Sequence, residues 1–240
     1  MGRGWVNAVR EAAGQAKGKA FTKIAKEIAV AVRLGGVNPD TNARLRTALK
    51  DAQKNSVPKD TVDRAIKRGS GASGEAQLDE MLYEGYGPHG VAVLLEALTD
   101  NKNRTVQDLR AMFVRKGGAL GEPGSVQWMF DRIASIKAKP KKAGLDPEEA
   151  AINAGANEVE ASEDDQTGEA LSHFIASPSD LDTVHKSLEE SGWEVVTSGL
   201  AYRPKTPVQL SEDQEKDLGV FVAALHDNED VKKYHLSVAS

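Results

Sequence analysis

Basic residues outnumber acidic ones about two to one in the first 75 residues of this chain, and clustered cations are the side chains that bind phosphate. This segment holds 15 Lys or Arg residues against 7 Asp or Glu, a net charge of +8. Residues 76–142 carry a net +2 and residues 143–240 a net −15, so the overall −5 hides a basic unit joined to an acidic remainder. A basic surface binds nucleic acid by releasing condensed counterions, whatever the charge elsewhere. The alternative is a set of solvated helix faces.

We predict that nucleic acid binds through residues 1–68. Lys19, Lys23 and Arg33 fall off the apolar stripe of their helix, so they should face solvent or a partner. Because aromatic residues make up only 5% of the chain, contact with the backbone is expected rather than base stacking. The candidate contact residues are Arg3, Trp5, Lys17, Lys19, Lys23, Lys26, Arg33, Arg44, Arg46, Lys59, Arg64, Lys67 and Arg68.

A second candidate site is the loop of residues 99–105, between an apolar strand and the start of a helix. Asn101, Asn103 and Arg104 offer amide and guanidinium donors there, which suits contact with an anion or with the carboxylate of a partner. The competing interpretation is that the asparagines satisfy the turn and cap the helix.

Two segments match the dinucleotide-binding pattern Gly-x-Gly-x-x-Gly, beginning at Gly69 and at Gly85. That fingerprint needs a strand before it and a helix after it, so that pyrophosphate meets a helix N-terminus. The first match follows a helix and leads into a polar linker. The second precedes the apolar run 91–95, so it is predicted to be a hairpin turn with closely approaching backbones.

No other pattern favours catalysis. The five histidines are scattered, without the short spacing of metal ligands. The chain has no cysteine, no Walker sequence and no Gly-x-Ser-x-Gly elbow. Acidic residues between 160 and 169 fall in a turn, where a solvated charge run is expected. We therefore expect a protein that is not an enzyme and holds no metal or cofactor.

The elements that must position the cations are three helices. An apolar stripe of period 3.6 beginning at Phe21 predicts the first helix, and residues 38–40 should begin the second. Pro58 should open the third helix, with Gly69 as its C-terminal cap. A basic helical bundle is the result.

Strands follow a flexible linker at residues 69–77. Strands at 82–86, 91–98 and 125–130 and a helix with Thr105 as its N-cap predict a central α/β domain. A helix and a strand near the C-terminus should complete it, because one strand is not stable alone. The remaining elements are read in the order βαββαβ, the split unit of a ferredoxin-like sandwich: 133–138, 146–154, 157–161, 169–176, 178–191 and 193–201.

The predicted fold class is therefore α+β, in three domains. A basic helical bundle occupies residues 1–75, a central α/β domain takes residues 76–132 and 206–240, and an acidic ferredoxin-like domain takes residues 133–205. The chain has no apolar run near the roughly 20 residues that span a bilayer and no signal-peptide segment. We expect a soluble monomer in the cytoplasm, or in the mitochondrial matrix if a transit peptide was removed.

Long motifs in the chain resemble the YebC/PmpR family. They are YEGYGP at 83–88, LTDNKNRT at 98–105 and GGALGEPGSVQWMF at 117–130, and the likeness covers nearly the whole chain. One departure is N-terminal: most members begin Gly-His-Ser-Lys-Trp, whereas this chain has Gly2-Arg3-Gly4-Trp5.

The resemblance implies three domains and a nucleic-acid-binding regulator of gene expression, without catalytic residues to transfer. A DNA-binding transcriptional regulator is the leading interpretation, because most members are described so. The alternatives that the family offers are a translation factor bound to ribosomal RNA and a mitochondrial translational activator. A small-molecule enzyme is the remote alternative.

Overall fold

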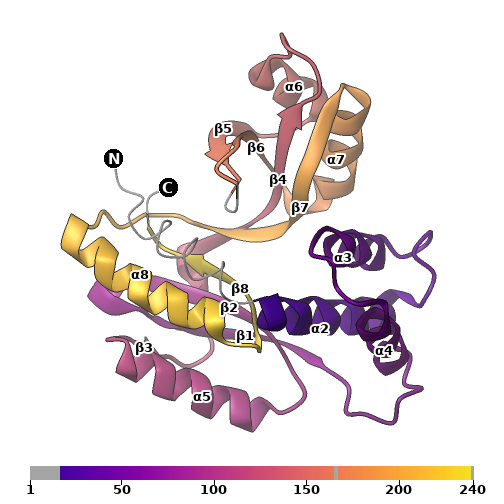
Figure 1. Ribbon diagram of the computed structural model, residues 1–240. Helices are drawn as coiled ribbons and strands as arrows, with labels where there is room; N and C mark the ends of the chain where they lie inside the picture. Colours follow the sequence, from indigo (N-terminus) through magenta and orange to yellow (C-terminus); the bar gives the residue numbers. More distant parts are fainter. Residues whose placement is uncertain (1–16, 165–166, 239–240) are drawn as a thin grey trace. The chain divides into compact units, whose positions relative to one another are not determined.

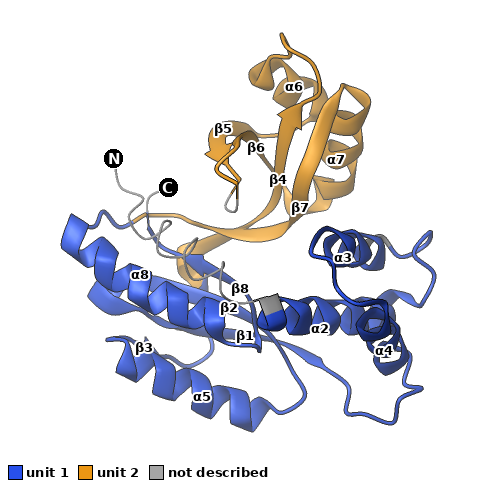
Figure 2. Ribbon diagram, in the orientation of Figure 1, with its two compact units in different colours: residues 1–127, 208–240 blue, residues 128–207 orange. Residues whose placement is uncertain are grey.

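The computed structural model describes residues 17–164 and 167–238, without the side chains of Lys17 and Ala43. Contacts divide the chain into two units, residues 1–127 with 208–240 and residues 128–207 (Figure 2). Helices and two antiparallel sheets confirm the α+β class. The division into three domains stays a prediction.

The first unit contains two groups of elements (Figure 1). Its helical bundle comprises α2 (Lys17–Gly35), α3 (Ala43–Lys54) and α4 (Lys59–Gly69). Its sheet and covering helices are β1 (Asp79–Tyr86), the short helix η1 (Pro88–Gly90), β2 (Ala92–Thr99), α5 (Lys102–Arg115), β3 (Ala119–Leu120), η2 (Gln127–Met129, whose last two residues belong to the second unit), α8 (Glu212–Asp227) and β8 (Val231–Leu236).

The bundle forms because the apolar stripe of α2 is buried against α3 and α4. Ile28 is fully buried, in one cluster with Leu45 and Ala65. The second helix begins at Ala43, later than predicted, because Asn42 serves as its N-cap and accepts a hydrogen bond from Leu45 N at 3.0 Å. The Asn42 amide also donates to the carbonyls of Ala31 and Gly36, at 2.7 and 2.8 Å. A buried side chain thus satisfies three backbone groups of the α2–α3 turn.

Gly69 lies within α4, and the prediction that it caps the helix is wrong, since Ser70 is the C-cap. A Cβ atom at Gly69 would overlap the carbonyl oxygen of Ala29 and lie 2.7 Å from Val32 Cβ. Glycine is therefore required where the end of α4 crosses α2, because helices approach this closely only without a side chain at the contact.

The sheet of the first unit has the order β3-β1-β2-β8, with every pair antiparallel. β1 and β2 form the predicted hairpin around residues 87–90, where Gly87 N donates to the carbonyl of Val91. α5 and α8 contribute to one core with these strands, and Phe113 meets Phe221 edge to face with centroids 5.0 Å apart. Elsewhere, Leu98 of β2 clusters with Ala29 and Val30 of α2, which joins the bundle to the sheet.

Two element boundaries differ from the prediction. α5 begins at Lys102 and is capped by Asn101, so Thr105 lies inside the helix. Residues 125–130 are not a strand: η2 covers 127–129, and the next strand begins at Phe130. The cause is Glu84, whose buried carboxylate accepts hydrogen bonds from the N–H groups of Gly124, Val126 and Gln127 at 2.7, 2.8 and 2.8 Å. Those hydrogen bonds hold residues 124–127 in a turn.

The second unit has the predicted βαββαβ order. Its sheet runs β5-β6-β4-β7, all antiparallel, which is the arrangement of a ferredoxin-like sandwich. Phe174 and Trp193 meet edge to face in a core that both helices share. The elements are β4 (Phe130–Pro140), α6 (Pro147–Ala154), β5 (Glu158–Glu163), β6 (Ala170–Ala176), the short helix η3 (Pro178–Asp180), α7 (Leu181–Glu190) and β7 (Trp193–Pro204).

Among the described residues, no helix has the length and apolar character needed to cross a membrane.

Candidate nucleic-acid interface

The structure separates the predicted contact residues into two groups. Arg3, Trp5 and the side chain of Lys17 lie outside the described residues. Six cations contact the rest of the first unit: Lys19, Lys23, Lys26, Arg33, Arg44 and Arg68. Four have no carboxylate partner in the described part of the chain: Arg46, Lys59, Arg64 and Lys67.

Three lysines of α2 face the C-terminal end of α8 and the segment that connects it to β8. Lys19 pairs with Asp227 at 2.5 Å, and Lys23 donates to the carbonyl of His226 at 2.6 Å. Lys26 pairs with Asp230 at 2.5 Å. All three lysines thus contact residues 226–230 of the same chain. Lysines at this place also complement the negative C-terminal end of the α8 dipole.

Lys23 is the most perturbed of these cations. Burial lowers its pKa to about 8, and the nearby carboxylate of Asp227 opposes that shift only in part. The same burial, with Lys23 as neighbour, lowers the pKa of His226. The ammonium group of Lys23 is largely removed from solvent, so this lysine holds α2 against the end of α8. We name the contacts of Lys19, Lys23 and Lys26 with residues 226–230 the joint.

Asp230 is the centre of the joint. Its buried carboxylate accepts hydrogen bonds from Lys26 Nζ, from Arg104 Nη2 at 3.2 Å and from Thr105 Oγ1 at 2.7 Å. Burial alone would raise the pKa of Asp230, but these hydrogen bonds outweigh it and hold the pKa below its usual range. The side chain thereby connects α2, α5 and the start of β8.

Arginine pairs extend the joint. Arg44 of α3 contacts Glu27 at 2.6 Å and Glu80 of β1 at 2.5 Å. Burial would raise the pKa of Glu27, but its bond to Arg44 and the charge of Lys232 lower it overall. Two further arginines reach the sheet, Arg33 to Asp79 at 3.5 Å and Arg68 to Asp100 at 3.0 Å.

The loop of residues 99–105 takes part in the same network. Asn101 accepts a hydrogen bond from Arg104 N at 3.0 Å as the N-cap of α5. Arg104 pairs with Asp100 at 3.1 Å as well as with Asp230, and Asn103 is exposed. The Asn101 side-chain oxygen and the Arg104 guanidinium therefore contact groups of the chain itself, whereas no such contact with any residue that the structure describes is seen for Asn103.

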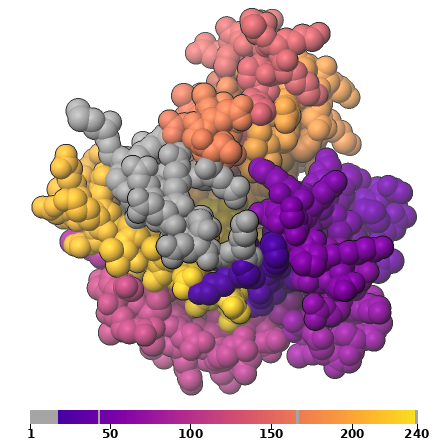
Figure 3. Space-filling view, in the orientation of Figure 1, coloured from indigo at the N-terminus to yellow at the C-terminus, as the bar shows by residue number. Residues whose placement is uncertain are grey.

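Cations on the outer surface of α3 and α4 form the candidate interface. Arg46, Lys50 and Lys54 follow one another at four-residue intervals along α3, on one side of the helix. Lys59, Arg64 and Lys67 lie on α4, and all six side chains are exposed. Figure 3 shows the purple residues of both helices on the visible surface. We name these six residues the outer basic face.

Lys50 and Lys54 are absent from the predicted contact residues. Their spacing from Arg46 is the sequence signal that groups them. None of the six outer residues forms an ion pair with a carboxylate within the described ranges; Arg46 and Arg64 bond backbone carbonyls instead. The described residues also contain no group of three or more His, Asp or Glu side chains placed to hold a metal ion.

Comparisons with known proteins agree with this architecture. A sequence model of the TACO1/YebC N-terminal domain matches residues 4–72, and one of the second and third TACO1/YebC domains matches residues 78–238. The chain is 45% identical over 239 residues to a probable transcriptional regulatory protein of Bdellovibrio bacteriovorus, covering 99% of this chain and 100% of that protein. A probable transcriptional regulatory protein of Pseudomonas fluorescens is 43% identical, with both chains covered completely.

A solved structure shares the fold. The crystal structure of a conserved hypothetical protein from Aquifex aeolicus superposes with a TM-score of 0.80 and 37% sequence identity, covering 94% of this chain and 91% of that one. The family resemblance stated from the sequence motifs is confirmed. Matches over nearly the full length, in sequence and in structure, lead to one assignment: the chain belongs to the TACO1/YebC family.

Proposed function

We propose that this protein is a nucleic-acid-binding regulator of gene expression and contacts the phosphate backbone through the outer basic face. The names of its bacterial relatives, probable transcriptional regulatory proteins, support regulation of transcription and action in the cytoplasm. They also support a binding protein rather than an enzyme.

One observation carries the proposal: some cations of the bundle contact carboxylates or carbonyls of the first unit, whereas others are exposed and form no ion pair among the described residues. Lys19, Lys23, Lys26, Arg33, Arg44 and Arg68 are engaged by carboxylates or carbonyls of the first unit. None of the six residues of the outer basic face forms an ion pair with a carboxylate within the described ranges; Arg46 and Arg64 bond backbone carbonyls, and Lys54 lies near Asp51. A cation that forms no ion pair can neutralise a phosphate without first breaking one.

Duplex DNA is the leading target and folded RNA the second candidate. Of the residues that α3 and α4 contribute to the surface, none is aromatic, so contact is with the backbone rather than by stacking on bases. Backbone contacts position a protein but carry no sequence information directly. The proposal therefore includes weak sequence selectivity and a strong dependence on salt.

The test is a charge reversal on the outer basic face of the full chain. Lys50→Glu, Lys54→Glu and Arg64→Glu are combined, and binding to a DNA duplex and to an RNA duplex is followed by fluorescence anisotropy. The matched control reverses Lys141, Lys142 and Lys186, which are exposed in the second unit, with the same change in net charge.

We expect the outer triple variant to bind at least about tenfold more weakly and to lose about two to three units of the log–log salt slope, since each phosphate contact contributes about 0.9. The control should keep the wild-type slope. Equal losses in the two variants would mean that only net charge matters and would refute a defined interface. Preference for RNA over DNA would select the second candidate.

A further inference from the structure

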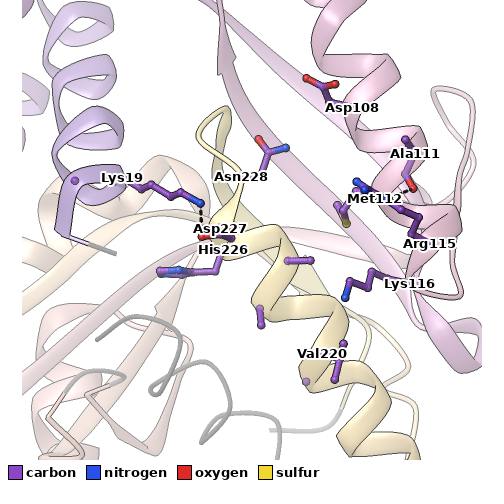
Figure 4. Close-up of a pocket in the computed structure, with 14 residues that line it drawn as sticks. Lys19, Asp108, Ala111, Met112, Arg115, Lys116, Val220, His226, Asp227 and Asn228 are labelled. Atoms are coloured by element: carbon purple, nitrogen blue, oxygen red, sulfur yellow. Dashed lines mark hydrogen bonds and ion pairs between the residues drawn. The ribbon is translucent and has the colours of Figure 1, made fainter. Parts of the chain in front are cut away.

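An open groove is lined by residues of α5 and α8 (Figure 4). Its volume is about 1410 Å³, and the N-terminal end of α2 borders it at Gly18 and Lys19. Small-molecule pockets enclose roughly 300–1,000 Å³ and bury most of the ligand. A larger, open groove between helices is the shape that receives a polypeptide segment.

Part of the lining of the groove consists of small and apolar side chains. α5 contributes Ala111 and Met112, and α8 contributes Gly219, Val220 and Ala223. Val220 is 55% exposed although it belongs to a helix that buries three residues beside it, Leu218, Gly219 and Phe221. Small side chains allow another helix to approach closely, because interaxial distance depends on the side chains at the contact.

Charges of opposite sign stand at different positions along α5. Asp108 lines the groove one turn before Ala111, whereas Arg115 and Lys116 line it one turn after, as Figure 4 shows. Among the described residues none of these three side chains has an ion-pair partner, and Arg115 Nε donates only to the carbonyl of Ala111 at 3.3 Å. Asp108 and Arg115 are seven residues apart, about 10 Å along the helix axis.

From the size, lining and charges of the groove we infer that it binds a short amphipathic helix of a partner protein. The small apolar face of that helix covers Ala111, Val220 and Ala223. A basic residue meets Asp108, and an acidic residue about two turns away meets Arg115 and Lys116. A second copy of this chain fits less well, because two grooves that face each other would leave both hollows unfilled, whereas protein contacts are close-packed.

The probe is a designed peptide of about 18 residues, long enough to hold a helix in water. It carries an apolar alanine and leucine stripe with Lys and Glu seven positions apart, and its binding to the full chain is measured by anisotropy. Ala111→Trp fills the groove from an exposed position. Val114→Trp is the matched control, since Val114 is 66% exposed on the same helix but does not line the groove.

We expect Ala111→Trp to weaken binding at least about tenfold and Val114→Trp less than about twofold. The double variant Arg115→Glu, Lys116→Glu should also bind weakly, and a peptide whose Glu is replaced by Lys should restore its affinity. Equal effects of the two tryptophans, no rescue, or no binding of the peptide would overturn the proposal. So would self-association of the chain that Ala111→Trp abolishes, because the occupant would then be a second copy.

Discussion

Replacing Asp230 should cost more stability than replacing an exposed carboxylate of the first unit, because two of its partners, Lys26 and Thr105, are largely buried with it. Lys26 and Thr105 would keep no negative partner at this position if the carboxylate were neutralised. Loss of one member of a buried pair leaves an uncompensated charge, whereas an exposed pair contributes little.

We predict that Asp230→Asn lowers the free energy of unfolding by about 3 kcal/mol. Asp227→Asn, which removes the partner of Lys19 at a side chain 61% exposed, should cost less than about 1 kcal/mol. Urea denaturation of both variants measures the difference. Similar losses of stability in the two variants would show that the buried carboxylate of Asp230 contributes no more than the exposed one of Asp227.

Arg104→Ala is expected to fall between those two variants. The arginine touches Asp230, but its own side chain is 48% exposed, so its removal leaves Lys26 and Thr105 on the carboxylate. A stability loss with unchanged nucleic-acid binding would identify the 99–105 loop as structural. Normal stability with lost binding would identify it as a contact site.

The lowered pKa of Lys23 predicts the direction in which the stability of the chain changes with pH. Its pKa is about 8 in the folded chain and near 10.5 in the unfolded chain, so between those values the unfolded state binds more protons. Stability contributed by this group therefore rises as pH increases from 8 to 10.5. Below pH 8 both states are protonated, and the cost of burying the charge is fully present.

The measurement compares wild type with Lys23→Met from pH 7.5 to pH 10, so that other titrating groups cancel. We expect wild type to gain on the order of 2 kcal/mol relative to the variant over this range. Parallel pH curves would contradict a lowered pKa at Lys23.

At the scale of elements, the crossing of α2 and α4 depends on the missing side chain of Gly69. We predict that Gly69→Ala destabilises the chain by about 2 kcal/mol, because the new methyl group meets backbone that cannot move aside. Gly18→Ala is the control: nothing lies within 4 Å of a Cβ there, so its effect should stay within about 1 kcal/mol. Thermal unfolding of both variants measures the difference in stability.

Elements with a continuous apolar period could be predicted from the sequence, and those held by a distant side chain could not. The stripe of α2 and the βαββαβ order of the second unit are examples of the first kind. The turn at residues 124–127 is of the second kind, because its N–H groups bond Glu84, about 40 positions earlier. Thr105 has good capping chemistry, yet Asn101 takes that role.

The candidate interface shows the same limit. Sequence spacing identifies which cations leave the apolar stripe of a helix, but not which of them meet a carboxylate. Lys23 and Lys26 find their partners more than 200 residues later. The outer basic face could therefore be separated from the joint only once the carboxylates and carbonyls that contact the other cations had been placed.

At the scale of the whole molecule, the two units differ in how local their structures are. Residues 128–207 contain all four strands of their sheet, both covering helices and a complete core. We predict that this fragment, expressed alone, folds and unfolds cooperatively, as circular dichroism during heating would show. A fragment without a cooperative transition would mean that the unit needs the rest of the chain.

The position of β8 beside β2 has a further consequence, for the order of events during synthesis. The helical bundle leaves the ribosome first, whereas residues 226–236 follow about 160 residues later. At about 5–20 residues per second, that interval lasts about 10 to 30 seconds. During it the lysines of α2 have neither Asp227 nor Asp230 to contact, and β2 has no β8. The nascent chain therefore exposes Lys19, Lys23 and Lys26 as free cations until residues 226–230 have been made and can contact them.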